Sequence, residues 1–397
     1  MHILHITPYY APAWAYGGSV RVAYELATRT ATHGHTVTVL TTDALDATHR
    51  AAPGTHTIDG VTVHRLPNLS NALAWRRVFL PRGFRRAAAR FVPAADVVHV
   101  HEARSLLNAA ALPALRRAGT PTIISPHGSL PDDLGRTAYK RVYDALWGRA
   151  FLERACRLHA LTEMEERQFL ALGLPADRTL RIPNGIDVTT ADLPADVDAF
   201  KRRFDIPPGQ PVVGFLGRLN AIKGLDFLVD AFALVLARRP DAVLLLAGPD
   251  DGARPALEAQ VERLGLRRAV RFTGMLTADV DKAAAYRATN VYVLPSRYEI
   301  LAITALEALL NATPSIVTDR CGLAGELQAA GIAEVVRFGD APALAARIVA
   351  ALAEPERARE QARRGQEYVR ERFSWEVVTA QWLEAYQTCL DAPREKR

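Results

Sequence analysis

Cysteine and long apolar runs are scarce in this 397-residue chain. Its three cysteines, Cys156, Cys321 and Cys389, show neither the spacing of a disulfide framework nor that of a metal site. No run of about 18 apolar residues is present, so no membrane-spanning helix is expected. The opening MHILHITPYY lacks the basic region and apolar core of a signal peptide and predicts a first β-strand. We therefore expect a cytoplasmic protein in a reducing compartment.

Histidine is absent from the second half of the chain, since all 11 histidines lie within residues 1–188. The same residues contain 22 lysines and arginines against 15 acidic residues, a net charge of +7, whereas residues 189–397 have a net charge of −1. The carboxylates Glu299 and Glu307 lie in that second half, with seven residues between them. A site that uses both histidine and this carboxylate pair would therefore lie between two domains.

Short runs of β-forming residues alternate with helical patterns along almost the whole chain. We predict strands at 2–7, 36–41, 61–66, 96–101, 122–125 and 157–162, then at 212–217, 242–247, 270–273, 291–294 and 315–318. Helices such as 19–32 and 104–118 fall between them. Nearly continuous apolar strands separated by helices predict an α/β protein with parallel sheets covered on both faces. Two such halves predict two Rossmann-like domains, whose ligands bind at the carboxyl ends of the strands.

A stretch rich in proline and turn residues separates the two halves, between Pro183 and Pro211. We expect a first domain at 1–188 and a second at 189–372. The final segment, 373–397, has apolar residues at helical spacing, namely Trp375, Val378, Trp382 and Tyr386. It therefore predicts a helix that packs back on the first domain.

Glycines and cations follow two of the predicted strands. Gly17-Gly18 comes after the first strand, with Ser19 as the expected N-cap of the next helix. Two glycines let backbone amides approach a phosphate or a sugar, although a loop that needs positive φ would also explain them. In GFLGRLNAIKG, the cations Arg218 and Lys223 suit a diphosphate. The spacing of a P-loop is absent, and a solvated basic turn is the alternative.

Three further strand ends have polar or glycine residues. His127, in SPHG, is positioned to donate to a substrate hydroxyl or a leaving phosphate oxygen, with a purely structural role as the alternative. His99 and His101 alternate on one strand, but no cysteine lies nearby and no His-Glu-x-x-His pattern occurs, so no metal site is predicted. In VRFTGML, the turn formed by Thr273, Gly274 and Met275 can present its backbone to a flat base or be a simple turn.

The carboxylates Glu299 and Glu307 lie on either side of a predicted turn between a strand and an apolar helix. Carboxylates accept hydrogen bonds from hydroxyls, and the helix N-terminus between them attracts an anion. This arrangement suits a ligand in which a diphosphate joins a sugar to a ribose.

Acidic residues are missing from 60–95, where seven arginines occur: Arg65, Arg76, Arg77, Arg82, Arg85, Arg86 and Arg90. Together with Leu80, Phe84 and Phe91 they form a basic amphipathic stretch. Such a stretch, centred on Arg76–Arg90, can bind an anionic membrane surface, and a solvated helix face is the alternative. No zinc-finger, RNP or recognition-helix pattern occurs, so no nucleic-acid partner is expected.

Taken together, these motifs resemble glycosyltransferase family 4, retaining enzymes of the GT-B fold, over nearly the whole chain. The matching pieces are the Gly17-Gly18 loop, HGHTVTVL, SPHG, IPNGID, GRLNAIKG, AGPD, VRFTG, the carboxylate pair and FSWE. The resemblance implies two Rossmann-like domains with parallel sheets facing an interdomain cleft. It also implies a UDP- or GDP-sugar donor, a glycan or lipid-linked acceptor, and neither a metal nor another cofactor.

The resemblance also implies residue roles. Arg218 and Lys223 would neutralise the donor diphosphate, and Glu307 would hold the ribose hydroxyls. Glu299 would contact the donor sugar, and His127 would lie near the reacting centre. The remaining implied donor contacts are backbone groups, at Gly17, Gly18, Thr273, Gly274, Met275, Leu301, Ala302 and Ile303.

The chain departs from the family pattern at one place, where Glu-Gly-Phe-Gly-Leu is replaced by Glu299-Ile300-Leu301-Ala302-Ile303. Because a β-branched residue does not readily adopt positive φ, Ile300 predicts a different loop path and affects which donor sugar fits.

The expected activity is retaining sugar transfer to a hydroxyl, in cell-envelope or exopolysaccharide synthesis, by a protein that can lie at the inner face of the cell membrane. Two alternatives remain. A nucleotide-sugar 2-epimerase shares the architecture but needs a separate set of proton-transferring residues. A non-catalytic nucleotide-sugar-binding subunit is supported only by the changes at Ile300 and Ala302.

Overall fold

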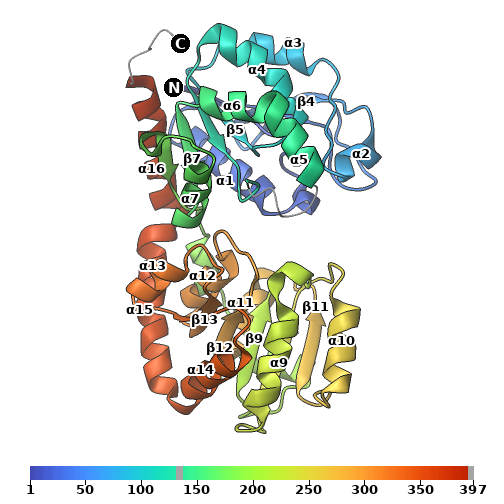
Figure 1. Cartoon of the computed structure of the whole chain (residues 1–397), viewed down its shortest axis with the longest axis vertical. Coiled ribbons are helices and arrows are strands. Elements are labelled where there is room, and N and C mark those ends of the chain that lie inside the picture. Colours follow the sequence, from blue (N-terminus) through green and yellow to red (C-terminus); the bar gives the residue numbers. More distant parts are fainter. Residues whose placement is uncertain (131–136, 392–397) are drawn as a thin grey trace. The chain divides into compact units, whose positions relative to one another are not determined.

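The computed structural model describes residues 1–130 and 137–391, and it divides into two compact units (Figure 1). The first unit comprises Met1–Gly185 and the C-terminal segment from Trp375, and the second comprises Ile186–Ser374. The sequence pattern places the same divisions a few residues away, after residues 188 and 372. In the described part of the chain, no helix has both the length and the apolar character needed to cross a membrane.

The first unit contains an eight-stranded sheet in the order β3-β4-β2-β1-β5-β6-β7-β8. Its strands are β1 His2–Ile6, β2 Thr36–Thr42, β3 Gly54–Ile58, β4 Val61–Leu66, β5 Val97–His101, β6 Thr122–Ser125, β7 Arg157–Ala160 and β8 Thr179–Arg181. All neighbours are parallel except β3, which is antiparallel to β4. The chain runs from β1 to one edge and then resumes at β5 on the other side of β1. The crevice beside β1 and β5, at their carboxyl ends, is therefore the expected ligand position.

Strand β3 was not predicted, and the prediction of wholly parallel sheets is wrong at this edge. The strand is mostly exposed and lacks the apolar run of a buried strand. The two-residue turn Asp59-Gly60, with φ of 47° and 81°, folds it back onto β4. Positive φ at both positions is the geometry that Asp-Gly hairpin turns adopt, so this dipeptide was the missed signal.

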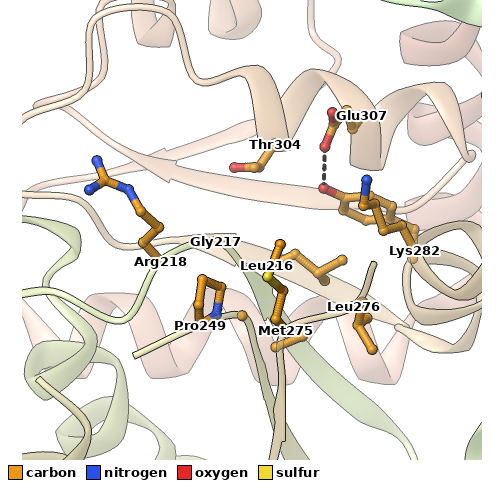
Figure 2. A pocket seen from close by; sticks show the side chains of 12 residues that line it. Leu216, Gly217, Arg218, Pro249, Met275, Leu276, Lys282, Thr304 and Glu307 are labelled. Carbon is orange, nitrogen blue, oxygen red and sulfur yellow. Dashed lines mark hydrogen bonds between the residues drawn. The ribbon is translucent and has the colours of Figure 1, made fainter. Parts of the chain in front are cut away.

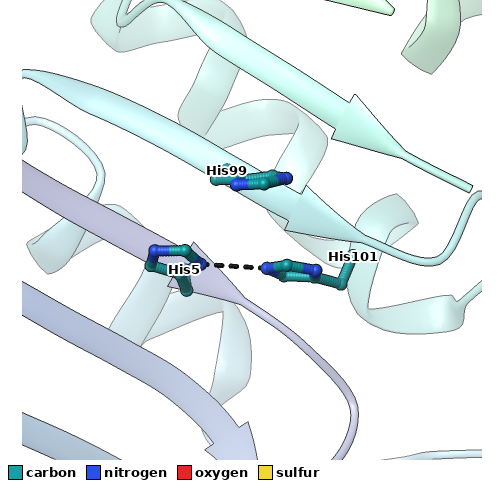
Figure 3. Close-up of side chains that lie close together, drawn as sticks. All are labelled: His5, His99 and His101. Carbon is teal, nitrogen blue, oxygen red and sulfur yellow. Dashed lines mark hydrogen bonds between the residues drawn. The ribbon is translucent and has the colours of Figure 1, made fainter. Parts of the chain in front are cut away.

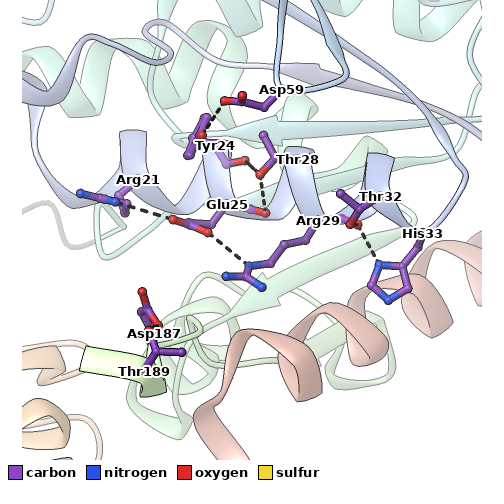
Figure 4. A network of polar contacts seen from close by, with 10 residues as sticks. All are labelled: Arg21, Tyr24, Glu25, Thr28, Arg29, Thr32, His33, Asp59, Asp187 and Thr189. Carbon is purple, nitrogen blue, oxygen red and sulfur yellow. Dashed lines mark hydrogen bonds and ion pairs between the residues drawn. The ribbon is translucent and has the colours of Figure 1, made fainter. Parts of the chain in front are cut away.

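The helices of the first unit are α1 Gly18–Thr32, α2 Asn71–Trp75, α3 Phe84–Phe91, α4 Leu106–Ala118, α5 Thr137–Tyr143, α6 Arg149–Arg154, α7 Glu163–Ala171 and α16 Trp375–Asp391. The predicted N-cap of α1 is wrong, because Gly17 occupies that position and the Ser19 hydroxyl lies 3.1 Å from the Tyr9 hydroxyl. Along α1, Glu25 pairs with Arg21 at 3.6 Å and with Arg29 at 3.2 Å (Figure 4).

The C-terminal helix α16 belongs to the core of the first unit. Its apolar residues Trp375, Val378, Trp382 and Tyr386 are buried in one cluster with Ile3, Val22, Leu26 and Val97 of β1, α1 and β5. The same packing brings the Sγ atoms of Cys156 and Cys389 to 2.7 Å from one another. No sequence pattern indicated this contact, since residues 233 positions apart meet only in the folded chain.

The second unit contains a six-stranded parallel sheet in the order β11-β10-β9-β12-β13-β14. Its strands are β9 Val212–Leu216, β10 Val243–Ala247, β11 Val270–Gly274, β12 Val291–Leu294, β13 Ser315–Thr318 and β14 Glu334–Val336. Its helices are α8 Val197–Arg203, α9 Leu225–Leu236, α10 Arg254–Arg263, α11 Asp279–Ala288, α12 Ile303–Leu310, α13 Ala324–Ala329, α14 Ala341–Ala353 and α15 Pro355–Phe373. The strand order reverses between β9 and β12, so the loops that follow these two strands flank the expected ligand crevice.

Candidate functional site

A pocket of about 250 Å³ lies at the carboxyl ends of β9, β10 and β11 in the second unit (Figure 2). Its walls come from the loops after these strands and from helices α11 and α12. The lining residues are Leu216, Gly217, Arg218, Ala247, Gly248, Pro249, Met275, Leu276, Lys282, Tyr286, Thr304 and Glu307. Three of the predicted donor-site residues, Arg218, Met275 and Glu307, are among them.

Glycines form the floor where the loops after β9 and β10 meet. Gly248 has φ +145°, and a Cβ added there would lie 1.9 Å from the carbonyl oxygen of Gly217. The amide of Gly217 donates to Ala247 (2.9 Å), and that of Gly248 donates to Gly274 (2.9 Å). The sequence pattern assigned Gly248 no role. The signal for it was a glycine directly after a buried strand, at the end that binds ligands in such sheets.

Glu307 projects from α12 toward the pocket, where the hydroxyl of Tyr286 donates to its Oε2 at 2.6 Å (Figure 2). Burial raises the pKa of Glu307, while the hydrogen bond from Tyr286 and the charge of Lys282 act in the opposite direction. No hydrogen bond to Oε1 is assigned within the described residues. This oxygen can therefore accept a hydrogen bond from a ligand hydroxyl.

The turn predicted to hold a base contributes less than expected. Met275 lines the pocket and is 65% exposed. Thr273 and Gly274 do not line the pocket. Their polar groups bond within the protein: the Thr273 hydroxyl donates to the Gly274 carbonyl (2.8 Å), which also accepts the amide of Gly248. Pro249 and Leu276, which the sequence did not single out, supply the other apolar wall.

The two predicted cations have different surroundings. Arg218 lines the pocket, is largely exposed and pairs with Asp251 at 2.7 Å. The Nζ of Lys223 contacts the carboxylate of Glu299, and both side chains are about four-fifths buried. The Ser296 hydroxyl lies 3.4 Å from the same carboxylate. The cation predicted for a diphosphate and the carboxylate predicted for a sugar are thus an ion pair in this structure.

Ala302 is the N-cap of helix α12 and has a left-handed φ of +55°. Ile300 is not in the left-handed region, so the residue that takes the strained conformation is the small one of the two that replace family glycines. Within residues 137–391, no acceptor is assigned to the backbone amides of Leu301, Ala302, Ile303 and Thr304. The side chains of Leu301 and Ala302 are buried, so these two residues can reach a ligand only through their backbone. Unpaired amides at the N-terminus of a helix favour an anion.

Replacing Ala302 with glycine is expected to raise the free energy of unfolding by about 0.5–1 kcal/mol. Left-handed backbone costs a residue with a Cβ about 1–2 kcal/mol, and the greater freedom of glycine in the unfolded chain offsets part of this gain. Urea unfolding measures the difference. Ala305→Gly, in the same helix at ordinary helical φ, should instead destabilise by about 1 kcal/mol or more. Equal destabilisation by both variants would contradict strain at Ala302.

In the first unit, His127 follows β6 and has φ +52°. Its Nε2 lies 2.9 Å from Nδ1 of His101, and burial lowers the pKa of His127 to about 4, so the ring is neutral at pH 7. Gly17, with φ +103°, caps helix α1. A Cβ added at Gly17 or Gly18 would meet no atom within 4 Å, so a ligand can approach this helix N-terminus closely.

Two family models match the chain. That of glycosyl transferases group 1 matches residues 196–368, and that of glycosyltransferase family 4 matches residues 16–190. The chain is 31% identical over 298 residues to a phosphatidyl-myo-inositol mannosyltransferase of Mycobacterium leprae, which covers 74% of this chain and 73% of the relative. It is 30% identical over 308 residues to the 2-deoxystreptamine glucosyltransferase of Streptomyces kanamyceticus, covering 76% and 79%.

Among solved structures, Anabaena HepE in complex with UDP superposes with a TM-score of 0.77 over 98% of this chain and 100% of that chain, at 19% identity. This likeness concerns the fold, and sucrose-phosphate synthase of Thermosynechococcus elongatus shares it with a TM-score of 0.76 at 22% identity, covering 98% and 99%. The predicted fold class is thereby confirmed as GT-B, and the chain belongs to glycosyltransferase family 4.

Proposed function

We propose that the protein is a retaining, metal-independent glycosyltransferase that moves a sugar from a UDP- or GDP-sugar to a hydroxyl of a glycan, glycolipid or related acceptor. The observation that carries the proposal is the pocket at the carboxyl ends of β9–β11, which combines an apolar wall with Glu307 and Arg218. A nucleoside fits this combination, with its base against Met275 and Pro249 and its ribose hydroxyls on Glu307.

The diphosphate would extend from this pocket toward the N-terminus of α12. There it would meet the unpaired amides of Leu301–Thr304, the guanidinium of Arg218 and the ammonium of Lys223. Negative charge develops on the leaving diphosphate as the bond to the sugar breaks, and donors already oriented toward it lower the barrier. Glu299, next to Lys223 and Ser296, is then positioned at the sugar end of the donor.

The chemistry of these groups supports transfer without a metal. Arg218, Lys223 and the amides at the start of α12 can balance the diphosphate charge, and the nearby carboxylates Asp251 and Glu299 are each paired with one of these cations. In the described residues, the group with metal-binding potential is His5, His99 and His101 of the first unit. We propose that retention results from attack by the acceptor hydroxyl on the face that the diphosphate leaves. Proton NMR of the first-formed product anomer tests whether the configuration is retained.

The nucleoside assignment is tested by thermal shift of the wild type and Glu307→Ala with UDP-, GDP-, ADP- and TDP-sugars. A ligand at 100 times its dissociation constant should stabilise the wild type by about 2.7 kcal/mol. We expect one base to produce the shift and Glu307→Ala to lose it. Glu258→Ala, which removes an exposed carboxylate paired with Arg254, should keep it. A full shift in Glu307→Ala would overturn the ribose assignment.

Turnover then distinguishes the proposed activity from its alternatives. Incubation with donor alone should yield at most slow hydrolysis. An epimerised donor sugar would establish the 2-epimerase instead. Retained donor binding without transfer to any of a broad acceptor panel would establish the non-catalytic subunit.

We propose an acceptor linked to the cell envelope or an exopolysaccharide, and peripheral contact of the first unit with the inner face of the cell membrane. The name of one relative specifies a phosphatidyl-inositol acceptor. A second cavity of about 430 Å³ supports the membrane contact, since it combines apolar residues with Arg85 and Arg86. Arg77, in the same basic stretch, does not contribute to this surface, because its guanidinium stacks on the rings of Tyr9 and Tyr16 at 5.0 and 5.1 Å.

The double variant Arg85→Glu/Arg86→Glu is expected to lower partitioning onto anionic vesicles at low salt by at least about 30-fold. Each basic residue near such a surface contributes about 1 kcal/mol, and the variant removes two. Vesicle sedimentation measures the partition coefficient. Arg116→Glu/Arg117→Glu, with the same charge change at the exposed end of α4, should have little effect. Failure of the wild type to bind these vesicles would remove the membrane contact.

A further inference from the structure

Five histidines gather at the centre of the sheet of the first unit. They come from four strands that are neighbours in the sheet: His5 on β1, His99 and His101 on β5, His127 directly after β6 and His159 on β7. His5, His99, His101 and His159 are fully buried or nearly so. Their hydrogen bonds form two separate chains, and Figure 3 shows the bond between His5 and His101 beside His99.

The first chain has a single possible order of protons. The carbonyl of Ile182 only accepts, so Nε2 of His159 carries the proton of their 2.7 Å bond. Burial lowers the pKa of His159 to about 3, so its Nδ1 is unprotonated and accepts from the Ser125 hydroxyl at 2.8 Å. Ser125 in turn accepts from Nε2 of His99 (2.6 Å), and Nδ1 of His99 accepts from the hydroxyl of Tyr386 (2.8 Å). Every ring nitrogen of this chain has a partner.

The second chain is open at both ends. Nδ1 of His5 lies 2.9 Å from Nε2 of His101, and Nδ1 of His101 lies 2.9 Å from Nε2 of His127. Burial lowers the pKa of all three rings, so each is neutral and carries one N–H. Nε2 of His5 and Nδ1 of His127 have no partner among the described residues. Only two proton orders satisfy both bonds: all N–H groups directed toward His127, or all directed toward His5.

The two orders differ in where the unpaired N–H lies. With the N–H groups directed toward His5, the unpaired donor is Nε2 of His5, at the end of the chain farthest from His127. With the opposite order, the core end is a bare lone pair and the free N–H is Nδ1 of His127. That nitrogen is also enclosed by protein atoms, but His127 follows the carboxyl end of β6, where ligands bind in such sheets. A ligand oxygen there would satisfy the N–H and select this order.

We propose that His101 and His5 are positioning residues that hold His127 as the neutral tautomer with its proton on Nδ1, so that it donates a hydrogen bond to an oxygen of the substrate. The inference rests on the proposed function for the identity of that oxygen, which belongs to the donor sugar, its phosphate or the acceptor. The coupling of the His127 tautomer to His101 and His5 follows from the bonds within the first unit. Because the two bonds are linked, loss of His101 releases His127 from this constraint.

The same region could be considered for a metal, since nitrogens of His5, His99 and His101 lie within 4.8 Å of one another. Both ring nitrogens of His99 and of His101 already have hydrogen-bond partners. The group contains no carboxylate or thiolate, so a divalent cation would leave two uncompensated positive charges in the core. A hydrogen-bonded chain is the arrangement that these nitrogens favour.

Nitrogen-15 NMR of the histidine rings in the full-length wild type tests the proposal directly, because protonated and bare ring nitrogens have distinct shifts. We expect His127 to show a protonated Nδ1 and a bare Nε2 at pH 7. The opposite tautomer, or line changes on adding Zn²⁺ or a chelator, would overturn it. This measurement needs no nucleotide-sugar, so its result can be interpreted even if the proposed function is wrong.

Variants supply a second test. His101→Phe removes both bonds of the open chain, and we expect His127 to become a mixture of tautomers and kcat to fall at least about tenfold. Ser125→Ala is the matched control, since it breaks the other chain at an equally buried position without touching His127. It should leave the His127 shifts unchanged, even if it lowers the melting temperature as much. Equal effects of both variants on the His127 tautomer would contradict a positioning role.

Discussion

Replacing Lys223 with alanine is expected to lower kcat by roughly 100- to 1000-fold, the usual cost of removing one oriented donor from a developing negative charge. Lys223 lies in a turn after β9, beside the strand-order reversal, and its ammonium is held in place by Glu299. An ammonium fixed before the donor binds needs no reorganisation when charge moves onto the diphosphate. Steady-state kinetics with saturating donor and acceptor measures the effect.

The kinetic constant that changes decides the role of Lys223. A transition-state role lowers kcat and kcat/KM together, whereas uniform binding of the donor raises KM alone. Arg254→Ala removes a cation from an exposed ion pair in the same unit and should change neither constant by more than about twofold. If Lys223→Ala kept kcat within threefold of the wild type, the proposed stabilisation of the leaving diphosphate would be wrong.

Gly248→Ala is expected to weaken donor binding at least tenfold and to lower the free energy of unfolding by about 2 kcal/mol or more. The new methyl group would lie 1.9 Å from the carbonyl oxygen of Gly217, and the φ of +145° is one that residues with a side chain rarely adopt. The loops after β9 and β10 would have to separate, and both line the pocket. Titration calorimetry with the nucleotide and urea unfolding measure the two effects.

Gly252→Ala separates backbone strain from this steric clash. Gly252 lies in the same loop with φ +91°, but a Cβ there meets no atom within 4 Å. The control should lose about 1 kcal/mol of stability and keep its affinity for the nucleotide. If the two alanine variants bound the nucleotide equally well, the close approach of the loops would have no part in forming the pocket.

The strands were predicted where a local pattern specifies them. β6, β12 and β13 have the predicted bounds because buried parallel strands are short runs between turn residues, and β4 has them because its residues alternate between buried and half-buried positions. The missed strands β8 and β14 have three residues each, and the missed β3 is mostly exposed. Such segments become strands mainly through pairing with a neighbour, and only β3 had a local signal, the Asp59-Gly60 turn.

The candidate site shows the same division. Arg218 and Met275 were identified because each follows a strand end at the expected edge of the sheet, and Glu307 because of its spacing from Glu299. Tyr286 was missed because it lies on α11, whose position against α12 depends on packing. The pairing of Lys223 with Glu299, 76 residues apart, could not be read from either motif alone.

By itself, the sequence determined the repeated α/β pattern, the family resemblance and the residues that end up near strand termini. Periodicity and turn residues act over a few positions, so they can be recognised in the amino-acid sequence. Only the tertiary structure decided that Cys156 meets Cys389 and that Ala302 takes the left-handed conformation before α12. The same holds for the hydrogen-bonded chain of His5, His101 and His127. Those contacts depend on strand order and register, which arise when segments distant in the sequence pack together.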